Sequence, residues 1–241
     1  MGNPVVTAIF LVLRLGIGLI LLRLALKDSR YRNLHWLAAC FYLNVLVLFL
    51  NGARLMLVSQ IVVIMIQICL AMFTHTTFYQ NRRSPVAWVI GGLVVGGGGS
   101  LYLWQRSPGS GFGGLRLMMV ICAANWLWHA FVAHRIWRSL RLDRSIEDWV
   151  KARYVMVVTY AIAMAALFLL LIPAGRVPRP VVRWAWPTIT MVSVVLQYLA
   201  WGMPAVLRRY LNRNYQPSAA AQQAMNMTEE DVLRALEKPA H

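Results

Sequence analysis

The stretch that decides the fold is residues 55–78, LMLVSQIVVIMIQICLAMFTHTTF, which contains no Asp, Glu, Lys or Arg. A helix needs about 20 apolar residues to cross the hydrocarbon core of a bilayer, so this stretch predicts a transmembrane helix. Six further stretches are of comparable length and apolar character. The seven expected spans are residues 4–26, 34–51, 55–78, 85–104, 115–137, 152–172 and 184–207.

The composition of the whole chain agrees with a membrane protein. Of its 241 residues, 59% are hydrophobic and only 13% are charged, whereas a soluble domain carries about 25% charged residues. We therefore expect an all-α integral membrane protein in which residues 1–214 form a seven-transmembrane-helix bundle. Residues 215–241 are expected to form a tail with a short amphipathic helix at about 229–238.

The distribution of basic residues predicts the orientation, because cytoplasmic loops are enriched in Lys and Arg. One side of the expected bundle carries Lys27, Arg30, Arg32, Arg82, Arg83, Arg135, Arg138, Arg141, Arg144, Lys151, Arg153, Arg208, Arg209 and Arg213. The other side carries Arg54, Arg106, Arg116, Arg176, Arg179 and Arg183. The first, richer set is expected in the cytoplasm, which places the N-terminus outside and the C-terminal tail inside. Short loops without an outer Asn-X-Ser/Thr sequence favour a bacterial inner membrane.

The net charge of +16 bears on the partners of the protein. In a soluble protein such an excess would suggest nucleic acid, but here the basic residues flank apolar stretches, where they contact anionic lipids. We expect anionic membrane lipids and another membrane or cytoplasmic protein as partners, and no nucleic acid. The basic cytoplasmic face is expected to comprise Arg135, Arg138, Arg141, Arg144, Arg208 and Arg209.

Arg14 is the most informative single residue, because it lies in the middle of the first expected span. A charge at the bilayer centre costs several kcal/mol and usually faces the interior of a bundle. None of the seven stretches contains an Asp or Glu that could neutralise it. Amide side chains are expected near the same depth in four other spans, at Asn44, Gln67, Asn125 and Gln197.

Two interpretations of this polar layer stay open. In the first, Arg14 binds an anionic group of a ligand, a lipid or a partner subunit. In the second, the amides hydrogen-bond across helices and hold Arg14, or its side chain extends toward the membrane surface. The sequence alone does not choose between a binding site and a structural network.

Glycines are concentrated in the fourth expected span. Gly92 and Gly96 form a small-xxx-small pair, which lets a neighbouring helix approach closely. Gly97–Gly99 follow directly, and we expect them to break or widen the helix near its outer end.

Histidines offer a weak case for metal or haem. His35, His75 and His134 are expected at one depth, in the cytoplasmic third of their spans, and His129 lies nearer the centre. Three histidines at one depth could bind zinc, and a pair could bind haem. The spans contain no carboxylate to orient such ligands, so we predict no cofactor and keep haem or metal as the alternative.

Three classes of function fit these features. The topology resembles that of the seven-helix input modules of bacterial sensors, which favours a non-enzymatic sensor or receptor-like module that signals through a separate partner. The alternative is a structural or accessory subunit of a larger membrane protein complex, for which the glycine pair and the short tail are suited. A haem- or metal-binding membrane enzyme is the third class, and no catalytic residues are predicted.

Overall fold

The computed structural model describes residues 4–53, 55–79, 85–106, 112–143, 146–171 and 179–213. These residues form α-helices and one short 3-10 helix, η1 (Ser29–Tyr31), and contain no strand. The helices are α1 (Pro4–Lys27), α2 (Leu34–Gly52), α3 (Met56–Phe78), α4 (Val86–Arg106), α5 (Phe112–Leu140), α6 (Asp148–Leu171), α7 (Arg179–Gly202) and α8 (Ala205–Leu211).

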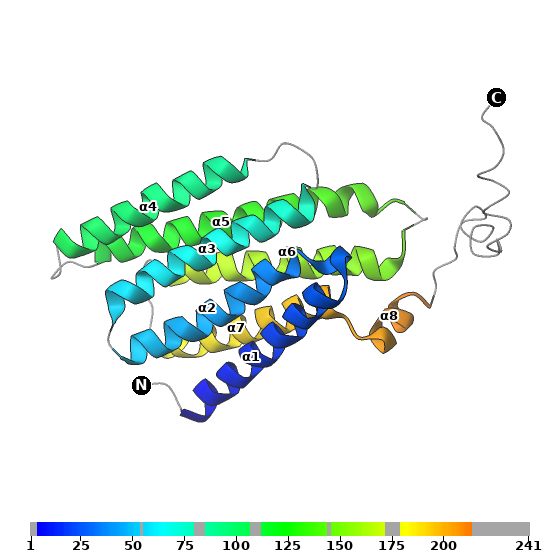
Figure 1. The fold of residues 1–241 in the computed structure, drawn as a ribbon, viewed down its shortest axis with the longest axis horizontal. Helices are drawn as coiled ribbons and strands as arrows, with labels where there is room; N and C mark the ends of the chain where they lie inside the picture. The colour runs from blue at the N-terminus through cyan, green and yellow to red at the C-terminus, as the bar shows by residue number, and fades with distance from the viewer. Residues whose placement is uncertain are drawn as a thin grey trace, which may run out of the picture.

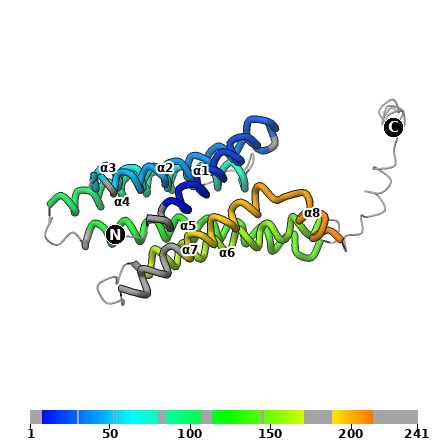
Figure 2. Tube along the Cα trace, turned by 90° about the horizontal axis from the view of Figure 1, so that it is seen from below, coloured from blue at the N-terminus to red at the C-terminus, as the bar shows by residue number. Residues whose placement is uncertain are grey.

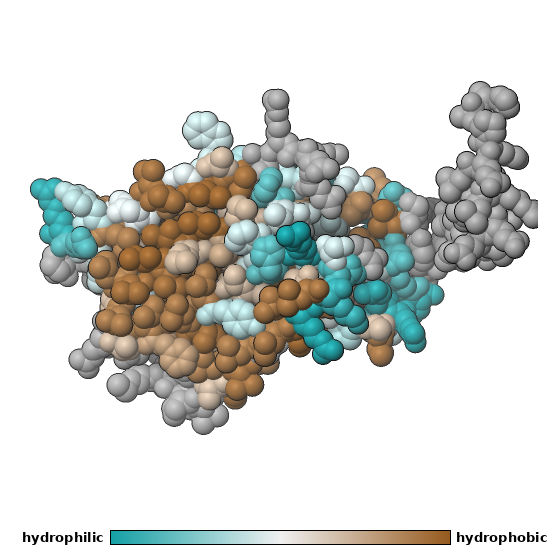
Figure 3. Space-filling model, viewed as in Figure 1, coloured by the Kyte–Doolittle hydropathy of each residue, from teal (hydrophilic) through white to brown (hydrophobic). Residues whose placement is uncertain are grey.

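Six of these helices, α1 to α6, are long and apolar enough to cross a membrane. A seventh would be added if the bent pair α7 and α8 formed one span. Figure 3 shows apolar side chains over the middle of the visible face and hydrophilic side chains gathered at the end near α8. The prediction of an all-helical chain with several membrane-spanning helices is confirmed in this form.

The long helices lie side by side along the long axis of the molecule (Figure 1). Each packs against its neighbour in the sequence, α3 also contacts α5, and α7 returns to α1. Figure 2 shows the result as two layers, with α1 to α4 in one and α5 to α7 in the other. The contact between α7 and α1 closes the bundle around an interior that six helices share.

The last expected span, residues 184–207, is not one straight helix. Helix α7 ends at Gly202, and α8 begins at Ala205 at an angle of 82°. Pro204 explains the break, because proline has no N–H to donate and disfavours a helical conformation in the residue before it. The chain therefore turns sharply at the end of the bundle where the basic residues of α8 lie.

The expected break at Gly97–Gly99 is wrong, since α4 is a continuous helix from Val86 to Arg106. The continuous helix is packed tightly here, because a Cβ at Gly96 would meet Ile121 of α5 and a Cβ at Gly97 would meet Ile64 of α3. Gly92 is exposed, and no atom lies within 4 Å of its Cβ position. The close approach within this chain thus depends on Gly96 and Gly97 rather than on the expected pair Gly92 and Gly96.

Gly114 makes the closest backbone approach in the α4–α5 pair and yields a prediction. A Cβ there would overlap the carbonyl oxygen of Ser100 and lie 3.0 Å from the backbone nitrogen of Trp104. Because backbone cannot rotate away, Gly114→Ala should destabilise the protein by about 1–3 kcal/mol, measured as a lower melting temperature in detergent. Gly98→Ala is the matched control, since no atom lies within 4 Å of that Cβ position. Equal melting temperatures for the two variants would contradict the tight contact.

Candidate functional site

A cavity of about 50 Å³ lies inside the bundle, lined by residues of α1, α2, α3, α5, α6 and α7. One water molecule needs about 10–15 Å³ of such space, so the cavity can hold several waters or a small ligand group. Its apolar wall includes Phe41, Leu70, Met164 and Val194. Its polar lining residues are Arg14, Asn44, Trp126, Thr190, Ser193 and Gln197.

Among the described residues that line the cavity, Arg14 is the only charged one, and it is only 8% exposed. Its guanidinium has no hydrogen bond or ion pair among the described residues. It lies over the ring of Phe10, with 5.7 Å between Cζ and the ring centre. The nearest acidic residue in the sequence is Asp28, which follows the last residue of α1 and lies about 20 Å further along the helix direction, at about 1.5 Å per residue. The structure thus leaves a buried cation beside an interior cavity without a carboxylate from its own helix.

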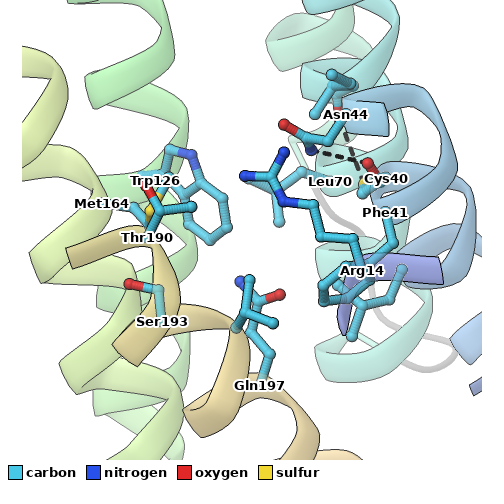
Figure 4. Close-up of a pocket in the computed structure, with 13 residues that line it drawn as sticks. Arg14, Cys40, Phe41, Asn44, Leu70, Trp126, Met164, Thr190, Ser193 and Gln197 are labelled. Carbon is cyan, nitrogen blue, oxygen red and sulfur yellow. Dashed lines mark hydrogen bonds between the residues drawn. The ribbon is translucent and has the colours of Figure 1, made fainter. Parts of the chain in front are cut away.

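Helix α7 contributes a polar face to the same cavity. Thr190, Ser193 and Gln197 are three and four residues apart, so they lie on one side of the helix, and all three are buried. Figure 4 shows Arg14 reaching from α1 toward Trp126 of α5, with Ser193 and Gln197 on the adjoining side. The Ser193 hydroxyl and the Trp126 indole N–H are buried without a hydrogen-bond partner among the described residues.

These side chains define the chemistry that the cavity can bind. A guanidinium, an indole N–H and a hydroxyl all donate hydrogen bonds, and the lining residues that the structure describes include no acidic side chain to compete for them. Leaving buried donors unpaired costs free energy, which an anion with several acceptor lone pairs would recover. The arrangement is therefore suited to a small anionic group.

The structure divides the expected polar layer into two groups. Arg14, Asn44 and Gln197 line the cavity, with the Asn44 amide donating to the Cys40 carbonyl oxygen at 2.7 Å. Gln67 and Asn125 do not line it. The Asn125 amide instead donates to the backbone and side-chain oxygens of Gln67, at 2.9 and 3.0 Å, which joins α5 to α3 as a structural contact.

Trp126, Thr190 and Ser193 belong to the cavity but were missing from the sequence-based candidates. The spacing of Thr190 and Ser193 from Gln197 is a signal that could have identified them, because it predicts one helix face. No such signal exists for Trp126, since an interior tryptophan has the same pattern as any apolar core residue.

His129 is at the centre of a separate hydrogen-bond network below the cavity. Its Nδ1 lies 2.7 Å from the Thr74 hydroxyl, and its Nε2 lies 3.0 Å from the Tyr160 hydroxyl. Thr74 donates its hydroxyl hydrogen to the Leu70 carbonyl oxygen at 2.8 Å, so its oxygen accepts a hydrogen bond from His129 Nδ1. His129 Nε2 then accepts a hydrogen bond from the Tyr160 hydroxyl. Trp201 Nε1 then donates to the Tyr160 oxygen at 3.4 Å. This series of hydrogen bonds gives both imidazole nitrogens a partner and links α3, α5, α6 and α7.

The other histidines are not brought together. Within the described ranges, no group of three His, Cys, Asp or Glu side chains could hold a metal ion. The His35 Nδ1 contacts the Arg32 carbonyl oxygen, His75 lies beside Tyr79, and His134 lies beside Trp137. The three candidates therefore have separate, local surroundings.

At the end of the bundle that holds α8, aromatic and basic side chains join α8 to α6. The Trp149 ring lies between two guanidinium groups, 4.4 Å from Arg153 Cζ and 4.5 Å from Arg208 Cζ. Asn212 accepts a hydrogen bond from the Trp149 backbone N–H at 3.1 Å and donates to Glu147 at 3.0 Å. These contacts hold α8 against the start of α6.

The structure describes five of the six residues of the predicted basic face. Arg135, Arg138, Arg141, Arg208 and Arg209 are all exposed. Arg144 and the expected tail helix at 229–238 lie outside the residues that the structure describes. An exposed row of guanidinium groups is able to bind anionic lipid or an acidic surface of a partner.

The attachment of α8 gives a second prediction. Asn212→Ala removes both hydrogen bonds to the start of α6, each of which contributes on the order of 1 kcal/mol, so amide hydrogen exchange in α8 should become about 30-fold faster. Arg209→Ala is the control, because Arg209 is exposed and makes no recorded hydrogen bond to the described residues. Unchanged exchange in Asn212→Ala would show that the stacked tryptophan alone holds α8.

The fold and the cavity define the class: an all-helical protein with helices able to cross a membrane and a buried cation beside an interior cavity. Comparisons of the chain with protein-family models, with curated proteins and with solved structures found no match.

Proposed function

We propose that the chain is a seven-helix membrane receptor-like module that binds an anionic ligand in the Arg14 cavity and signals through a separate cytoplasmic or membrane partner. The observation that carries this proposal is the buried Arg14 guanidinium, which has no ion pair among the described residues and lines a cavity with other hydrogen-bond donors. Under this proposal the bundle lies in a bacterial inner membrane.

The proposed topology has the N-terminus outside and the C-terminus in the cytoplasm. Its support is the excess of Lys and Arg at the end of the bundle that holds α8, because such residues are retained on the cytoplasmic side. Helix α7 provides the seventh crossing, and α8, which turns by 82°, then lies along the inner surface. Exposed Arg208 and Arg209 suit that position beside anionic headgroups.

The energetics of Arg14 favour a ligand over an isolated charge. An arginine at the centre of a membrane helix costs at least about 2.5–3.5 kcal/mol, and the chain supplies no acidic residue at that depth. A guanidinium binds a carboxylate through two parallel hydrogen bonds. Ligand binding would thus neutralise the charge and provide acceptors for donors that are otherwise unpaired.

A route from the cavity to the proposed partner surface runs along α7. Gln197 lines the cavity, and Trp201, one turn later, contacts Tyr160 and lies 5.3 Å from the Arg153 guanidinium. Arg153 stacks on Trp149, which also stacks on Arg208 of α8. A shift of α7 on ligand binding would therefore change the docking of α8 and the basic face beside it.

A second candidate, an accessory subunit of a membrane complex, is favoured by a different observation. Gly91, Gly92 and Gly98 of α4 are exposed, and no atom lies within 4 Å of the Cβ position of any of them. A surface of this kind allows a helix of another subunit to approach closely. This function would not require a ligand in the Arg14 cavity.

Native mass spectrometry after gentle purification separates the two candidates. For a receptor-like module we expect a bound small anion that is lost in Arg14→Gln and retained in Arg23→Gln, a matched control because Arg23 is an exposed arginine of the same helix. An accessory subunit would instead purify with stoichiometric membrane partners and release no anion in either variant. That second result would overturn the receptor proposal.

A further inference from the structure

The cavity is closed on the side that leads toward α8. Directly beyond it lie Phe73, Thr74, His129 and Tyr160, all with 0% exposure, and they are held by the hydrogen bonds described above. Leu21 of α1 and Ala200 of α7 are buried to the same degree. A ligand that entered from this end would have to unpack the most tightly packed part of the bundle.

The opposite half of α1 packs differently. Among the residues of α1 whose burial is described, which start at Ala8, no side chain up to Leu13 is buried and the first buried one is Arg14. It continues at Ile17, Gly18, Leu21 and Ala25, spaced as one face of a helix. A Cβ at Gly18 would lie 3.2 Å from the Tyr42 ring of α2, and a Cβ at Gly202 of α7 would lie 3.9 Å from Leu24, so these close approaches to α1 fall in its second half. Figure 1 shows its N-terminal half diverging from α2 and α7.

Arg14 is therefore placed where the α1 flank opens, and that flank faces lipid. Ile9 and Val12 are exposed there, at 47% and 70%. Arg14 lies about 15 Å from the first residue of α1, at about 1.5 Å per residue, which is deep within the hydrocarbon region of a bilayer. A ligand dissolved among the acyl chains is already at this depth, whereas a water-soluble anion would have to cross apolar surface.

The size and lining of the cavity restrict the head of such a ligand. A cavity of about 50 Å³, enough for a few water molecules, has room for a carboxylate. The carboxylate matches the fork of the Arg14 guanidinium. The apolar wall formed by Phe41, Leu70, Met164 and Val194 can contact the first methylene groups.

We propose that the ligand is a single-chain alkyl carboxylic acid that enters laterally from the bilayer, along the N-terminal half of α1, and places its carboxylate on Arg14. This inference rests on the proposed function and names the ligand class of the same cavity. A water-soluble carboxylate would present the same carboxylate group from the aqueous phase, so the test varies the carboxylate and the alkyl chain of the ligand separately.

The test measures saturable binding of tritiated dodecanoate to the protein in phosphatidylcholine nanodiscs, corrected for empty nanodiscs. Unlabelled dodecanoate should displace the label, whereas dodecanol, which has the chain without the charge, and millimolar acetate, which has the charge without the chain, should not. Arg14→Gln should weaken binding on the order of 100-fold, because it removes one partner of a buried charge pair. Arg23→Gln should bind as the wild type does. Arg14→Lys keeps the charge but not the two parallel donors of the guanidinium, so its affinity for dodecanoate should lie between those of Arg14→Gln and the wild type.

Each contrary result has a distinct meaning. Displacement by millimolar acetate would overturn the bilayer route and leave the anion site intact. Displacement by dodecanol, or equal binding by folded Arg14→Gln, would overturn the carboxylate contact. If native mass spectrometry shows an Arg14-dependent anion but dodecanoate does not bind, the ligand class is wrong and the proposed function stands. If neither experiment detects an Arg14-dependent anion, both are wrong.

Discussion

Arg14→Leu is expected to abolish binding of the anionic ligand and, at the same time, to raise the melting temperature of the ligand-free protein. The guanidinium provides the only positive charge among the described residues of the cavity lining, and losing one partner of a buried charge pair costs about 2–5 kcal/mol of binding free energy. The empty protein gains instead, because an arginine in the hydrocarbon core costs at least about 2.5–3.5 kcal/mol. A substitution that weakens ligand binding but raises the melting temperature indicates a residue that is retained for function.

The measurement pairs ligand binding in nanodiscs with thermal unfolding in detergent. Arg23→Leu is the control for both, since Arg23 is in α1 but exposed, and it should change neither quantity substantially. If Arg14→Leu leaves every bound ligand and partner in place and only raises the melting temperature, Arg14 is not a binding residue. If it lowers the melting temperature of the ligand-free protein, Arg14 holds the helices together.

His129→Ala is expected to cause the largest loss of stability in the bundle, about 3–5 kcal/mol. Removing a large, fully buried side chain leaves a cavity, and the hydroxyls of Thr74 and Tyr160 each lose a partner within 3.0 Å. An unsatisfied buried group costs about 1–3 kcal/mol. The melting temperature in detergent, measured by tryptophan fluorescence, reports the change.

Two other variants show whether the network itself is responsible. His134→Ala changes an exposed histidine of the same helix, so it should have little effect on the melting temperature. Tyr160→Phe removes only the hydroxyl that donates to His129 and should cost about 1 kcal/mol. Similar melting temperatures for His129→Ala and His134→Ala would mean that the buried imidazole adds no stability.

Much of the helical architecture can be predicted from the sequence. A bilayer requires about 20 apolar residues per crossing, so the expected stretches 34–51 and 55–78 lie within a residue or two of α2 and α3. Glycine was a poorer guide. Its intrinsic cost in a helix suggested a break at Gly97–Gly99, but contacts with Ile64 and Ile121 keep α4 continuous.

The depth of a residue follows from counting along its helix, but its direction around the helix axis relative to other helices does not. Counting therefore predicts Asn125 and Gln67 at the depth of Arg14, but the helices are rotated so that these two amides face each other. The same rotations bring Ser193 and Trp126 to the cavity. Those rotations depend on how side chains of neighbouring helices interlock, which no single helix encodes.

The sequence by itself determined that apolar helices would make up the fold and that Arg14 would have no acidic partner within them, because both follow from which residues are present. Only the tertiary structure decided what surrounds Arg14: the point where α1 leaves the bundle, the polar face of α7 and the closed network around His129. The physical reason is that composition sets the solvent and the charge, whereas packing between helices sets which polar groups meet.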